Sequence, residues 1–344
     1  MIWPKITIII PTLNSAKVLN HCLKSIQQQN YPQSKIKILI VDGGSTDATI
    51  RIAQKYKTKI INNPLKTAEA AKAVGIKKAN SKYVALIDSD NILPQPNYLK
   101  KMVLPMEKDN KLIASEPIKF TYRSKAGFIE RYSALIGAND PYAFVTKVYD
   151  RLSYLTNKWT DLKLQYIDKG QYIKVKLKPK QNIPTIGANG TVFRQSFLKK
   201  YFLSSKQNNY FFDIDIISMA LSSKKSCLYI AKVKIGIIHS FCESSISKFI
   251  HKQQRRLIDY YQYQPIRHFN WSKHNQTAII KFSVYSLSLI APLFDSIRGF
   301  VIKPDPAWFF HLPACLITFF TYAQITILSK LKLLKPLSRQ TWQQ

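Results

Sequence analysis

The N-terminal quarter of the chain contains short runs of β-branched and other apolar residues, and the longest of them end abruptly in proline or aspartate. Runs of this length bounded by turn residues are typical of strands buried in a parallel sheet. The expected strands are residues 6–10, 36–41, 59–61 and 83–87, and the expected helices between them are residues 16–29, 47–56 and 69–78. This alternating order predicts an α/β fold with a doubly wound, mostly parallel sheet, in which a ligand binds beyond the carboxyl ends of the strands.

The charge of the chain is strongly unbalanced. Its 344 residues include 52 lysines and arginines and 19 acidic residues, which gives a formal net charge of +33. Such a field attracts anions, and nucleic acid, anionic lipid headgroups and phosphorylated substrates all fit it. Hydrophobic residues make up 46% of the chain, so a sizeable core is expected.

The four cysteines are scattered and no two have CxxC spacing, so neither a zinc site nor a disulfide framework is expected. A reduced, cytosolic environment is the simplest interpretation. The first five residues run straight into an apolar strand, without the h-region or cleavage site of a signal peptide. The bulk of the protein is therefore expected to stay in the cytosol.

The middle of the chain is less regular. Residues 116–136 are expected to contain a strand and a helix. Residues 171–179 alternate between lysine or tyrosine and aliphatic residues, which predicts a half-exposed strand with a lysine face. Two interpretations stay open for this face. It is either an edge strand whose lysines guard against aggregation, or a basic lip that helps to hold a phosphorylated acceptor.

Two apolar stretches near the C-terminus indicate membrane association. Residues 282–294 are too few to span a bilayer, whereas residues 307–328 are long enough. Residues 224–273 before them carry ten basic and two acidic residues, and the C-terminal tail is also basic, as expected on the cytosolic leaflet of an anionic membrane. A spanning hairpin and interfacial or re-entrant helices both remain, and we favour the latter. A buried core helix of a soluble enzyme is the alternative.

Asp88-Ser89-Asp90 directly follows an expected buried strand. Side chains i and i+2 project the same way while a strand continues, so both carboxylates can face one point. Two carboxylates there suit a hard divalent cation, which would also take diphosphate oxygens and neutralise the charge of a leaving group. The alternative is a helix cap or an Asx-turn.

A second candidate loop, residues 42–47, reads Asp-Gly-Gly-Ser-Thr-Asp and also lies at a strand end. Its glycines allow a tight turn and a close approach to a ligand, and Asp42 could accept a hydrogen bond from a nucleotide base. The alternative is a loop that only caps the next helix. Six of the 19 acidic residues lie in three short clusters, namely Asp42 and Asp47, Asp88 and Asp90, and Asp213 and Asp215. This concentration argues mildly against surface decoration alone.

These motifs, in this order and at this spacing, resemble those of a family 2 glycosyltransferase with the GT-A fold. The matching segments are Ile-Ile-Ile-Pro-Thr-Leu-Asn (8–14), Val-Asp-Gly-Gly-Ser-Thr-Asp (41–47), Leu-Ile-Asp-Ser-Asp-Asn (86–91), Gly-Ala-Asn-Gly (187–190) and Phe-Asp-Ile-Asp (212–215). The resemblance covers residues 5–255. It implies that the donor is held by Pro11, Thr12, Asn14, Asp42, Lys72, Asp88, Ser89 and Asp90. Within this set, Asp42 would hold the base, and Asp88 and Asp90 the diphosphate and Mn²⁺ or Mg²⁺.

The resemblance also implies the later site residues. Asp213 stands where the family has its general base, with Asp215 as a substitute, because the acid that commonly precedes the base is replaced by Phe212. An acceptor that is itself an ionised phosphate would need no base. His239 is the third candidate metal ligand, with a structural histidine as the alternative. The expected contacts to diphosphate or acceptor are Gly187, Asn189, Gln253, Arg255 and Arg256; for the last three the alternative is a basic helix face against anionic lipid.

Together these features predict a GT-A catalytic domain over residues 1–225, with its donor-binding half over residues 1–115. A basic membrane-proximal segment (226–275) and apolar helices with a basic tail (276–344) follow it. The expected activity is metal-dependent, inverting transfer of a hexose from a UDP- or GDP-sugar to a lipid-linked or polysaccharide acceptor of the cell envelope, at the cytoplasmic face of the membrane. Nucleic acid is not expected as a partner. The alternatives are a catalytically degenerate scaffold and a basic protein that binds membrane or nucleic acid.

Overall fold

The computed structural model describes residues 2–187, 189–205, 208–224, 226–269 and 276–334. Its centre is a sheet with the strand order β3-β2-β1-β4-β9-β6-β10-β8-β7, and β5 pairs with the far end of β10. The strands are β1 (Ile6–Thr12), β2 (Ile36–Asp42), β3 (Lys59–Asn62), β4 (Tyr83–Leu86), β5 (Asn91–Ile92), β6 (Leu112–Phe120), β7 (Gln165–Asp168), β8 (Tyr172–Leu177), β9 (Thr191–Arg194) and β10 (Leu228–His239).

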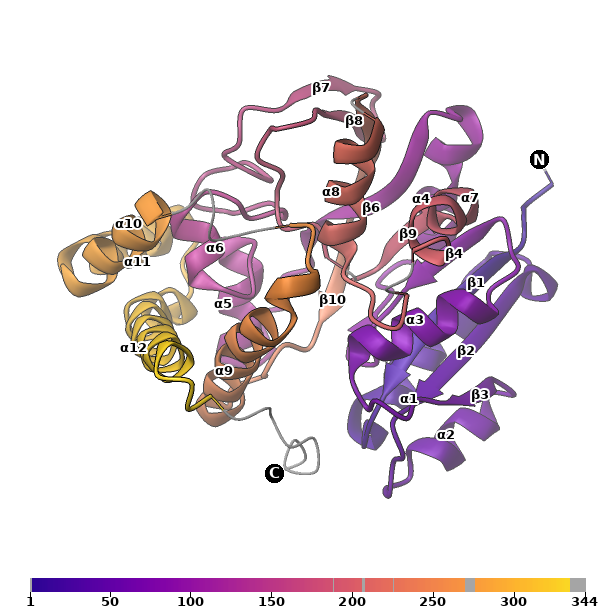
Figure 1. Cartoon of the computed structure of the whole chain (residues 1–344), viewed down its shortest axis with the longest axis horizontal. Helices are drawn as coiled ribbons and strands as arrows, with labels where there is room; N and C mark the ends of the chain where they lie inside the picture. Colours follow the sequence, from indigo (N-terminus) through magenta and orange to yellow (C-terminus); the bar gives the residue numbers. More distant parts are fainter. Residues whose placement is uncertain (1, 188, 206–207, 225, 270–275, 335–344) are drawn as a thin grey trace.

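Helices cover the sheet and extend beyond it (Figure 1). The α-helices are α1 (Ala16–Gln27), α2 (Thr49–Lys55), α3 (Ala68–Lys78), α4 (Tyr98–Lys108), α5 (Phe128–Ile136), α6 (Pro141–Val145), α7 (Gln195–Leu198), α8 (Asp213–Lys224), α9 (Ile246–Tyr263), α10 (Gln276–Leu287), α11 (Ile290–Ile302) and α12 (His311–Lys330). Short turns of helix are η1 (Gln33–Lys35), η2 (Lys199–Leu203), η3 (Gln264–Ile266) and η4 (Pro306–Phe310).

The prediction of parallel strands with intervening helices is confirmed for the N-terminal part. β1 lies between β2 and β4, and β3 follows β2, all in parallel. The expected strand and helix within residues 116–136 correspond to β6 and α5. The sheet is not parallel throughout, because β9 inserts antiparallel between β4 and β6 and β8 is antiparallel to β10. The fold is therefore a mixed α/β sheet flanked by helices.

One helix start differs from the expectation. The helix predicted from residue 47 begins at Thr49, because the carboxylate of Asp47 stays outside it and accepts the backbone N–H of Thr49 at 2.9 Å. The same carboxylate accepts the N–H of Ala16, the first residue of α1, at 3.0 Å. Asp47 thus satisfies a free N–H at the start of α1 and joins the loops that follow β1 and β2.

β1 is buried on both faces, because helices cover both sides of the sheet. Ile8 and Ile10 belong to the core cluster that includes α1 and α4, whereas Ile9 belongs to the cluster that includes α3. Gly75 of α3 lies directly on Ile9, and a Cβ at Gly75 would come within 2.5 to 2.9 Å of that side chain. The missing side chain lets α3 pack this close, which fixes the helix that carries Lys72.

β8 shows the expected alternation, with Ile173, Val175 and Leu177 buried. It is not an edge strand, since β10 pairs with one side of it and β7 with the other. The interpretation of its lysines as guards of a sheet edge is therefore wrong. Lys174 instead contacts the carboxylate of Asp109 and lies over the ring of Tyr229. The basic lip for an acceptor stays a prediction.

The C-terminal helices pack onto the rest of the chain through a core of their own. Trp308 and Phe310 of η4 form this core with residues of α5, α9 and α12. Figure 1 shows α12 alongside α9, with α10 and α11 at the far left edge. Within the described residues, Pro306–Lys330 is long and apolar enough to cross a membrane, and the bent pair α10 and α11 passes the same test if taken as one span.

Candidate active site

The loops after β1 and β2 are joined through Asp42, the last residue of β2. Its Oδ1 accepts from the hydroxyls of Thr12 (2.8 Å) and Ser45 (2.5 Å), and its Oδ2 accepts from the N–H groups of Gly44 (2.9 Å) and Ser45 (2.7 Å). These four bonds match the number of acceptor sites on a carboxylate. Asp42 therefore shapes the loop, and the hydrogen bond from a nucleotide base stays a prediction.

Asn14 forms the other half of this junction. Its backbone is left-handed (φ 47°), its N–H donates to the Ser45 hydroxyl at 2.8 Å, and its side-chain oxygen accepts from the Thr46 N–H at 2.7 Å. Asparagine tolerates this backbone conformation better than most residues. The structure therefore brings Asn14 and the preceding Pro11 to the same end of the sheet as Asp42.

The two aspartates after β4 contact different partners. An oxygen of Asp88 lies 3.9 Å from Nζ of Lys72, whose side chain is buried in α3. An oxygen of Asp90 lies 3.4 Å from Nε2 of His239 and 3.7 Å from Nζ of Lys252. Burial raises the pKa of Asp90, but His239 and Lys252 outweigh burial and hold this pKa well below its ordinary range. The strand ends two residues before Asp88, so the alternation of a strand no longer aligns the two carboxylates.

Ser89 lies between them and its hydroxyl is 3.2 Å from the hydroxyl of Ser15, the residue that precedes α1. The Asp88–Asp90 segment is thereby tied to the loop after β1. All three loops expected to hold the donor meet at the carboxyl ends of β1, β2 and β4.

Main-chain pairing brings His239 to Asp90. His239 ends β10 opposite Asn91 of β5, and the Ser240 N–H donates to the Asp90 carbonyl oxygen at 3.0 Å. Within the described ranges, no three His, Cys, Asp or Glu side chains form a ready metal cluster, and the buried Oδ1 of Asp88 has no hydrogen-bond partner there. An Asp–His pair with a second carboxylate two residues away, whose Oδ1 has only the Lys72 ammonium at 3.9 Å, still suits Mn²⁺ or Mg²⁺ if diphosphate oxygens complete the ligand set.

Asp213 is the first residue of α8, and only 8% of it is exposed. Burial raises its pKa to about 7, with Lys72 opposing the shift and Asp88 adding to it. Burial lowers the pKa of Lys72, but Asp88, Asp213 and Glu69 outweigh burial and raise it, so Lys72 keeps its proton. A carboxyl group with a pKa near neutral has the property expected of a general base.

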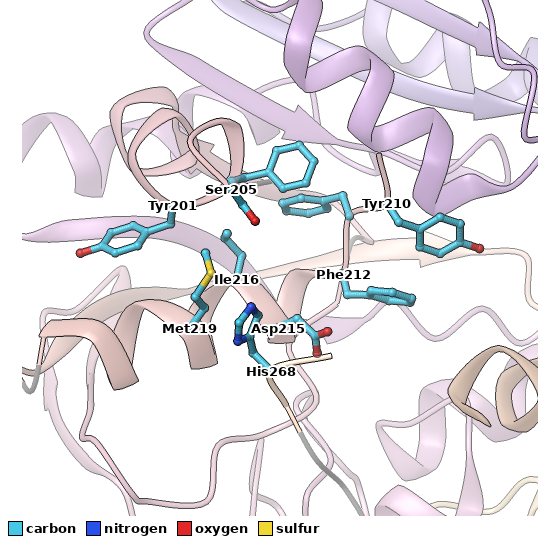
Figure 2. A pocket seen from close by; sticks show the side chains of 10 residues that line it. Tyr201, Ser205, Tyr210, Phe212, Asp215, Ile216, Met219 and His268 are labelled. Carbon is cyan, nitrogen blue, oxygen red and sulfur yellow. The ribbon is translucent and has the colours of Figure 1, made fainter. Parts of the chain in front are cut away.

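Asp215 points to another side of α8, because residues two apart on a helix differ by about 200° in direction. Its Oδ1 and Oδ2 accept from Arg267 at 3.1 to 3.2 Å, and the guanidinium group lies over the ring of Phe212. Figure 2 shows Asp215 and His268 at a hollow lined mainly by aromatic side chains. The structure therefore separates Asp213 from Asp215 and places Asp215 in an ion pair.

One face of α9 meets the donor side of the site. Lys252 lies by Asp90, and one turn further along the helix Arg255 lies 3.3 Å from Glu69 of α3. Residues three apart share a helix face, so the two basic side chains together contact both segments that carry donor-side residues. Arg255 is thus placed near the expected diphosphate position.

A neighbouring face of α9 carries Gln253 and Arg256, which the structure does not bring to the donor side. Arg256 pairs with Asp140 at 2.9 Å and donates to Oε1 of Gln253 at 2.6 Å. Gln253 is fully buried and its amide donates to the Asn139 carbonyl oxygen at 3.4 Å. Tyr322 of α12 donates to the same Asp140 at 2.7 Å. In this arrangement the two residues join α9 to α6 and α12.

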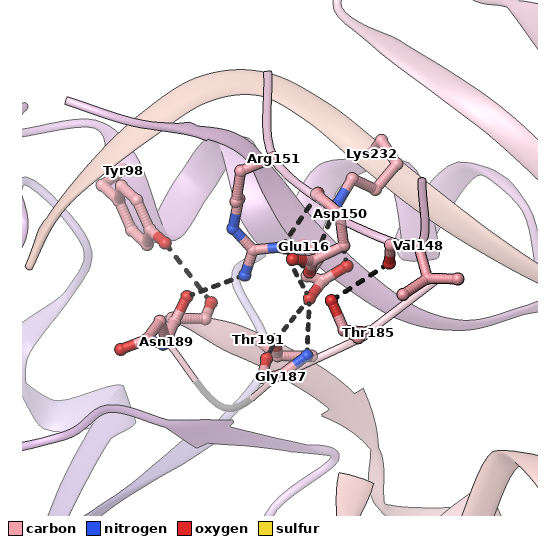
Figure 3. Close-up of polar contacts among 11 residues, drawn as sticks. Tyr98, Glu116, Val148, Asp150, Arg151, Thr185, Gly187, Asn189, Thr191 and Lys232 are labelled. Atoms are coloured by element: carbon pink, nitrogen blue, oxygen red, sulfur yellow. Dashed lines mark hydrogen bonds and ion pairs between the residues drawn. The ribbon is translucent and has the colours of Figure 1, made fainter. Parts of the chain in front are cut away.

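Gly187 lies over a buried ionic network (Figure 3). Oε1 of Glu116 accepts from the Gly187 N–H at 3.2 Å and from the Thr191 hydroxyl at 3.3 Å. Arg151 and Lys232 each contact the Glu116 carboxylate at 2.9 Å, and all three side chains are at most 1% exposed. Burial raises the pKa of Glu116, but the two cations outweigh burial and lower it to about 2. The network anchors both ends of the 187–190 loop.

Asn189 faces the candidate donor site from this loop. Its side-chain oxygen accepts from the amide of Asn91 at 3.0 Å, and Nη2 of Arg151 donates to its carbonyl oxygen at 3.5 Å. Asp150 completes the network by contacting Arg151, and burial raises the pKa of Asp150 to about 7. The loop thereby connects Asn91, the residue after Asp90, to the buried ionic network.

Sequence reasoning missed Glu69 and the ionic network. Lys252 was readable, because it opens the basic motif Lys-Gln-Gln-Arg-Arg (252–256) that resembles the family's contact to diphosphate or acceptor, and it shares a helix face with Arg255. Glu69 begins the helix that carries Lys72, and its pairing with Arg255 depends on the approach of two distant segments. Nothing in the local sequence marks Glu116 and Lys232 as partners, because they lie 116 residues apart on neighbouring strands.

The sequence matches the model of one protein family, "Glycosyl transferase family 2", over residues 7–202, which is more than half of the chain. Glycosyltransferase AglE of Haloferax volcanii is 29% identical over 137 residues, covering 38% of this chain and 45% of AglE. The poly(ribitol-phosphate) beta-N-acetylglucosaminyltransferase TarS of Staphylococcus aureus is 31% identical over 96 residues, covering 26% of this chain and 17% of TarS. The chain thus matches less than half the length of these curated relatives.

Among solved structures, the mannosyltransferase PcManGT from Pyrobaculum calidifontis, in complex with GDP-Man and Mn²⁺, is similar in fold. Its sequence is 15% identical, the alignment covers 99% of this chain and 84% of PcManGT, and the TM-score is 0.50. At this identity the likeness concerns the fold alone.

Proposed function

The chain belongs to glycosyl transferase family 2, and on that premise we propose that it transfers a hexose from a UDP- or GDP-sugar to a lipid-linked or polysaccharide acceptor. The observation that carries the proposal is the arrangement beyond the carboxyl ends of β1, β2 and β4. A preformed loop around Asp42, the buried ammonium of Lys72 and the near-neutral carboxyl of Asp213 lie there together. The relatives are named for sugar transfer, and the bound donor of PcManGT is GDP-Man.

The donor diphosphate would lie among basic side chains that are now paired with the chain's own acids. Lys72 contacts Asp88 and Lys252 contacts Asp90. The oxygens of a bound diphosphate would accept charge-assisted hydrogen bonds from these two ammonium groups. Mn²⁺ or Mg²⁺, held by Asp90 and His239 with Asp88 nearby, would supply neutralisation of the leaving diphosphate. The Asp42 loop would receive the base and ribose.

Asp213 would act as the general base. As its carboxylate takes the proton from an acceptor hydroxyl, the hydroxyl oxygen bonds to the anomeric carbon, and the bond from that carbon to the diphosphate oxygen breaks. The nucleoside diphosphate leaves with the electron pair, and attack from the opposite side inverts the configuration. Asp215 is less suited to this role, because its oxygens are held by Arg267.

We place the reaction at the cytoplasmic face of a membrane, where a lipid-linked acceptor can reach the site. Support comes from the exposed apolar residues of α10 and α11 and from the basic residues around them. Such a surface suits an anionic bilayer better than water. The acceptor would approach from the side of α5 and α9, which carry the C-terminal helices.

A nucleotide panel tests the donor assignment without knowledge of the acceptor. The melting temperature of the purified protein is measured with UDP, GDP and CDP, with and without Mn²⁺, in wild type, Asp90→Ala and the control Asp168→Ala on exposed β7. A nucleotide at about 100 times its Kd should stabilise the fold by about 2.7 kcal/mol. We expect a metal-dependent rise with one nucleotide that Asp90→Ala loses and Asp168→Ala keeps. The proposal fails if folded wild-type protein responds to none.

The stereochemistry has its own test. Once donor and acceptor are known, ¹H NMR of the first product formed gives the anomeric configuration. Inversion relative to the donor is expected, and retention would exclude the single-displacement role of Asp213.

A further inference from the structure

The helix α11 has its large apolar residues outside and its small or polar residues inside. Its buried positions are Pro292, Ser296 and Gly299. Its most exposed residues are instead aliphatic, with Ile290 78% and Val301 75% exposed. A surface helix of a soluble protein shows the reverse pattern, with its apolar residues buried and its polar residues exposed. The pattern is that of helices in lipid, where small residues allow close packing and the apolar face meets hydrocarbon.

Gly299 shows how close this inner packing is. A Cβ at Gly299 would overlap the indole ring of Trp308, so α11 lies directly against η4. The indole N–H donates to the Lys303 carbonyl oxygen at 3.0 Å. The inner face of α11 is therefore a specific contact. On its outer side, Phe300 packs against Phe309, whereas Ile290, Phe294 and Val301 are 62 to 78% exposed.

The neighbouring helices repeat the pattern. α10 buries Ala278 and Ser286 together with one large residue, Phe282, and it exposes Ile279, Ile280, Val284 and Leu287. α12 buries alanine, cysteine, threonine and histidine together with one large apolar residue, Ile325, and it exposes Phe320 at 60% and Ile327 at 56%. All three C-terminal helices, α10, α11 and α12, thus expose large apolar residues.

The length and bend of α10 and α11 limit the depth to which they can insert into a bilayer. The two helices meet at an angle of 77°, and they have 12 and 13 residues, which correspond to about 18 and 20 Å. The hydrocarbon core of a bilayer is about 30 Å thick. Neither arm spans it, and the bend at Ser288 and Leu289 turns the second arm nearly perpendicular to the first.

α12 is long enough to span but is tied along its length to the catalytic part. Tyr132 of α5 contacts His311 at 2.7 Å, and Tyr261 of α9 bonds Thr326 at 3.1 Å. Between these, Tyr322 bonds Asp140. α9 carries a charged face that cannot enter hydrocarbon without a large cost. A helix joined to α5 at its first turn and to α9 near its last cannot leave them to cross the bilayer.

The charges of this unit match an anionic surface. Among residues 276–334, the basic ones are Lys281, Arg298, Lys303, Lys330 and Lys332. The acidic ones are Asp295 and Asp305, and both are engaged: Asp295 accepts from Tyr285 at 2.7 Å and pairs with Arg298 at 3.8 Å. Asp305 is bound by Arg131 at 3.0 Å. A second copy of the chain on this face would bring like charges together, whereas anionic headgroups would neutralise them.

We propose that α10 and α11 form an elbow that inserts into one leaflet of an anionic bilayer, with α12 lying along the protein and the chain not crossing the membrane. The inference deepens the proposed membrane location by giving its mode. It places residues 276–287, 290–302 and 311–330 on one side of the bilayer midplane. The catalytic sheet and the end of α12 then face the same compartment.

A flotation experiment tests the surface. The full chain is mixed with vesicles of phosphatidylcholine alone or of phosphatidylcholine with phosphatidylglycerol, and the floated fraction is measured. Ile290→Asp/Val301→Asp should lower the partition coefficient at least about tenfold, and the matched control Ile167→Asp, on a residue 58% exposed on β7, should not. Circular dichroism confirms that each variant folds. The leaflet assignment is wrong if the double variant floats like wild type. It is also wrong if light scattering shows that wild type is a dimer and the only effect of the substitutions is to make it a monomer.

Cysteine labelling tests the mode and is independent of sugar transfer. Cys227, the half-buried native thiol, is replaced by serine, and Ile167→Cys, Ser288→Cys and Lys330→Cys are introduced one at a time. Sealed right-side-out and inverted membrane vesicles are treated with a membrane-impermeant maleimide. We expect Ile167→Cys and Lys330→Cys to react from the same side and Ser288→Cys to react only after detergent. Labelling of residues 167 and 330 from opposite sides would show a span and overturn the proposal, whereas a failed transfer assay would leave this result unchanged.

Discussion

Replacing Lys232 by methionine is the most direct way to measure the ionic network under the 187–190 loop. Lys232 is fully buried, contacts the Glu116 carboxylate at 2.9 Å and donates to the Asp150 carbonyl oxygen at 2.5 Å. Methionine preserves most of the volume and removes the charge. Glu116 then keeps Arg151 as a cationic partner, but it shares Arg151 with Asp150.

The magnitude follows from burial. Removing one partner of a fully buried ion pair costs about 3 to 5 kcal/mol, and in Lys232→Met the desolvated carboxylate of Glu116 is left to share the single cation of Arg151 with Asp150. The entropy of unfolding is about 2.1 cal/mol/K per residue, or about 0.7 kcal/mol/K for a chain of 344 residues. The melting temperature should therefore fall by about 4 to 7 °C.

The control lies two residues away on the same strand. Lys234 pairs with Asp168 at 2.7 Å, but the two side chains are 40% and 55% exposed, so Lys234→Met should cost under about 1 kcal/mol. Differential scanning calorimetry compares the two variants, and Glu116→Gln/Lys232→Met should recover part of the loss because the unpaired charge is gone. The reasoning is refuted if Lys232→Met melts within about 1 °C of Lys234→Met.

Four further predictions concern the site and its support. Asp213→Asn should lower transfer at least about 100-fold while leaving nucleotide-induced stabilisation intact. In wild type, activity should rise with pH through about 7, because burial raises the pKa of Asp213 to about 7 and only the ionised form accepts a proton; a flat profile between pH 6 and 8 would contradict this role. Gly75→Val should lower the free energy of unfolding by about 1 to 3 kcal/mol in urea titrations, since the new side chain overlaps Ile9; an unchanged midpoint would contradict the packing argument. Lys252→Gln should weaken nucleoside diphosphate binding about tenfold in isothermal titration and leave nucleoside binding unchanged; equal losses for both would show a structural role.

The N-terminal part of the fold could be predicted because its information is local. β1, β2 and β4 are continuous apolar runs that end in Pro11, Asp42 and Asp88, or close to them, and helices lie between them. The carboxyl ends of neighbouring parallel strands meet at one edge, so the motifs at these ends had to come together. The antiparallel insertion of β9 depends on a pairing with strands more than 70 residues away in sequence, which a local pattern does not contain.

Lys232 and Lys234 show a second limit of prediction from sequence. They are two residues apart in a strand and would share a face if the alternation were regular. The register between β10 and β6 shifts between Val233 and Gly236. This bulge sends Lys234 to the surface and leaves Lys232 buried against Glu116. Alternation alone cannot locate a bulge, so the buried partner of Glu116 was beyond sequence reasoning.

The residues after Asp88 illustrate a third limit, at the level of the site. A common direction for Asp88 and Asp90 was expected from strand geometry, but β4 ends at Leu86. The position of Asp90 is decided by β5 and its pairing with β10. The residue types of the site were therefore readable from the motifs, and their partners were set by segments that arrive later in the chain.

The pairing of β5 with β10 also has a consequence for the order in which the protein matures. Because synthesis proceeds from the N-terminus, a growing chain has Asp88, Asp90 and Lys72 in place long before residue 239 is made. Until β10 fills the gap between β6 and β8, the centre of the sheet is open and the proposed Asp90–His239 pair does not exist. If Asp90 and His239 hold the metal as proposed, a nascent chain that has made only its N-terminal loops would be unable to consume nucleotide-sugar before its acceptor-side half is built.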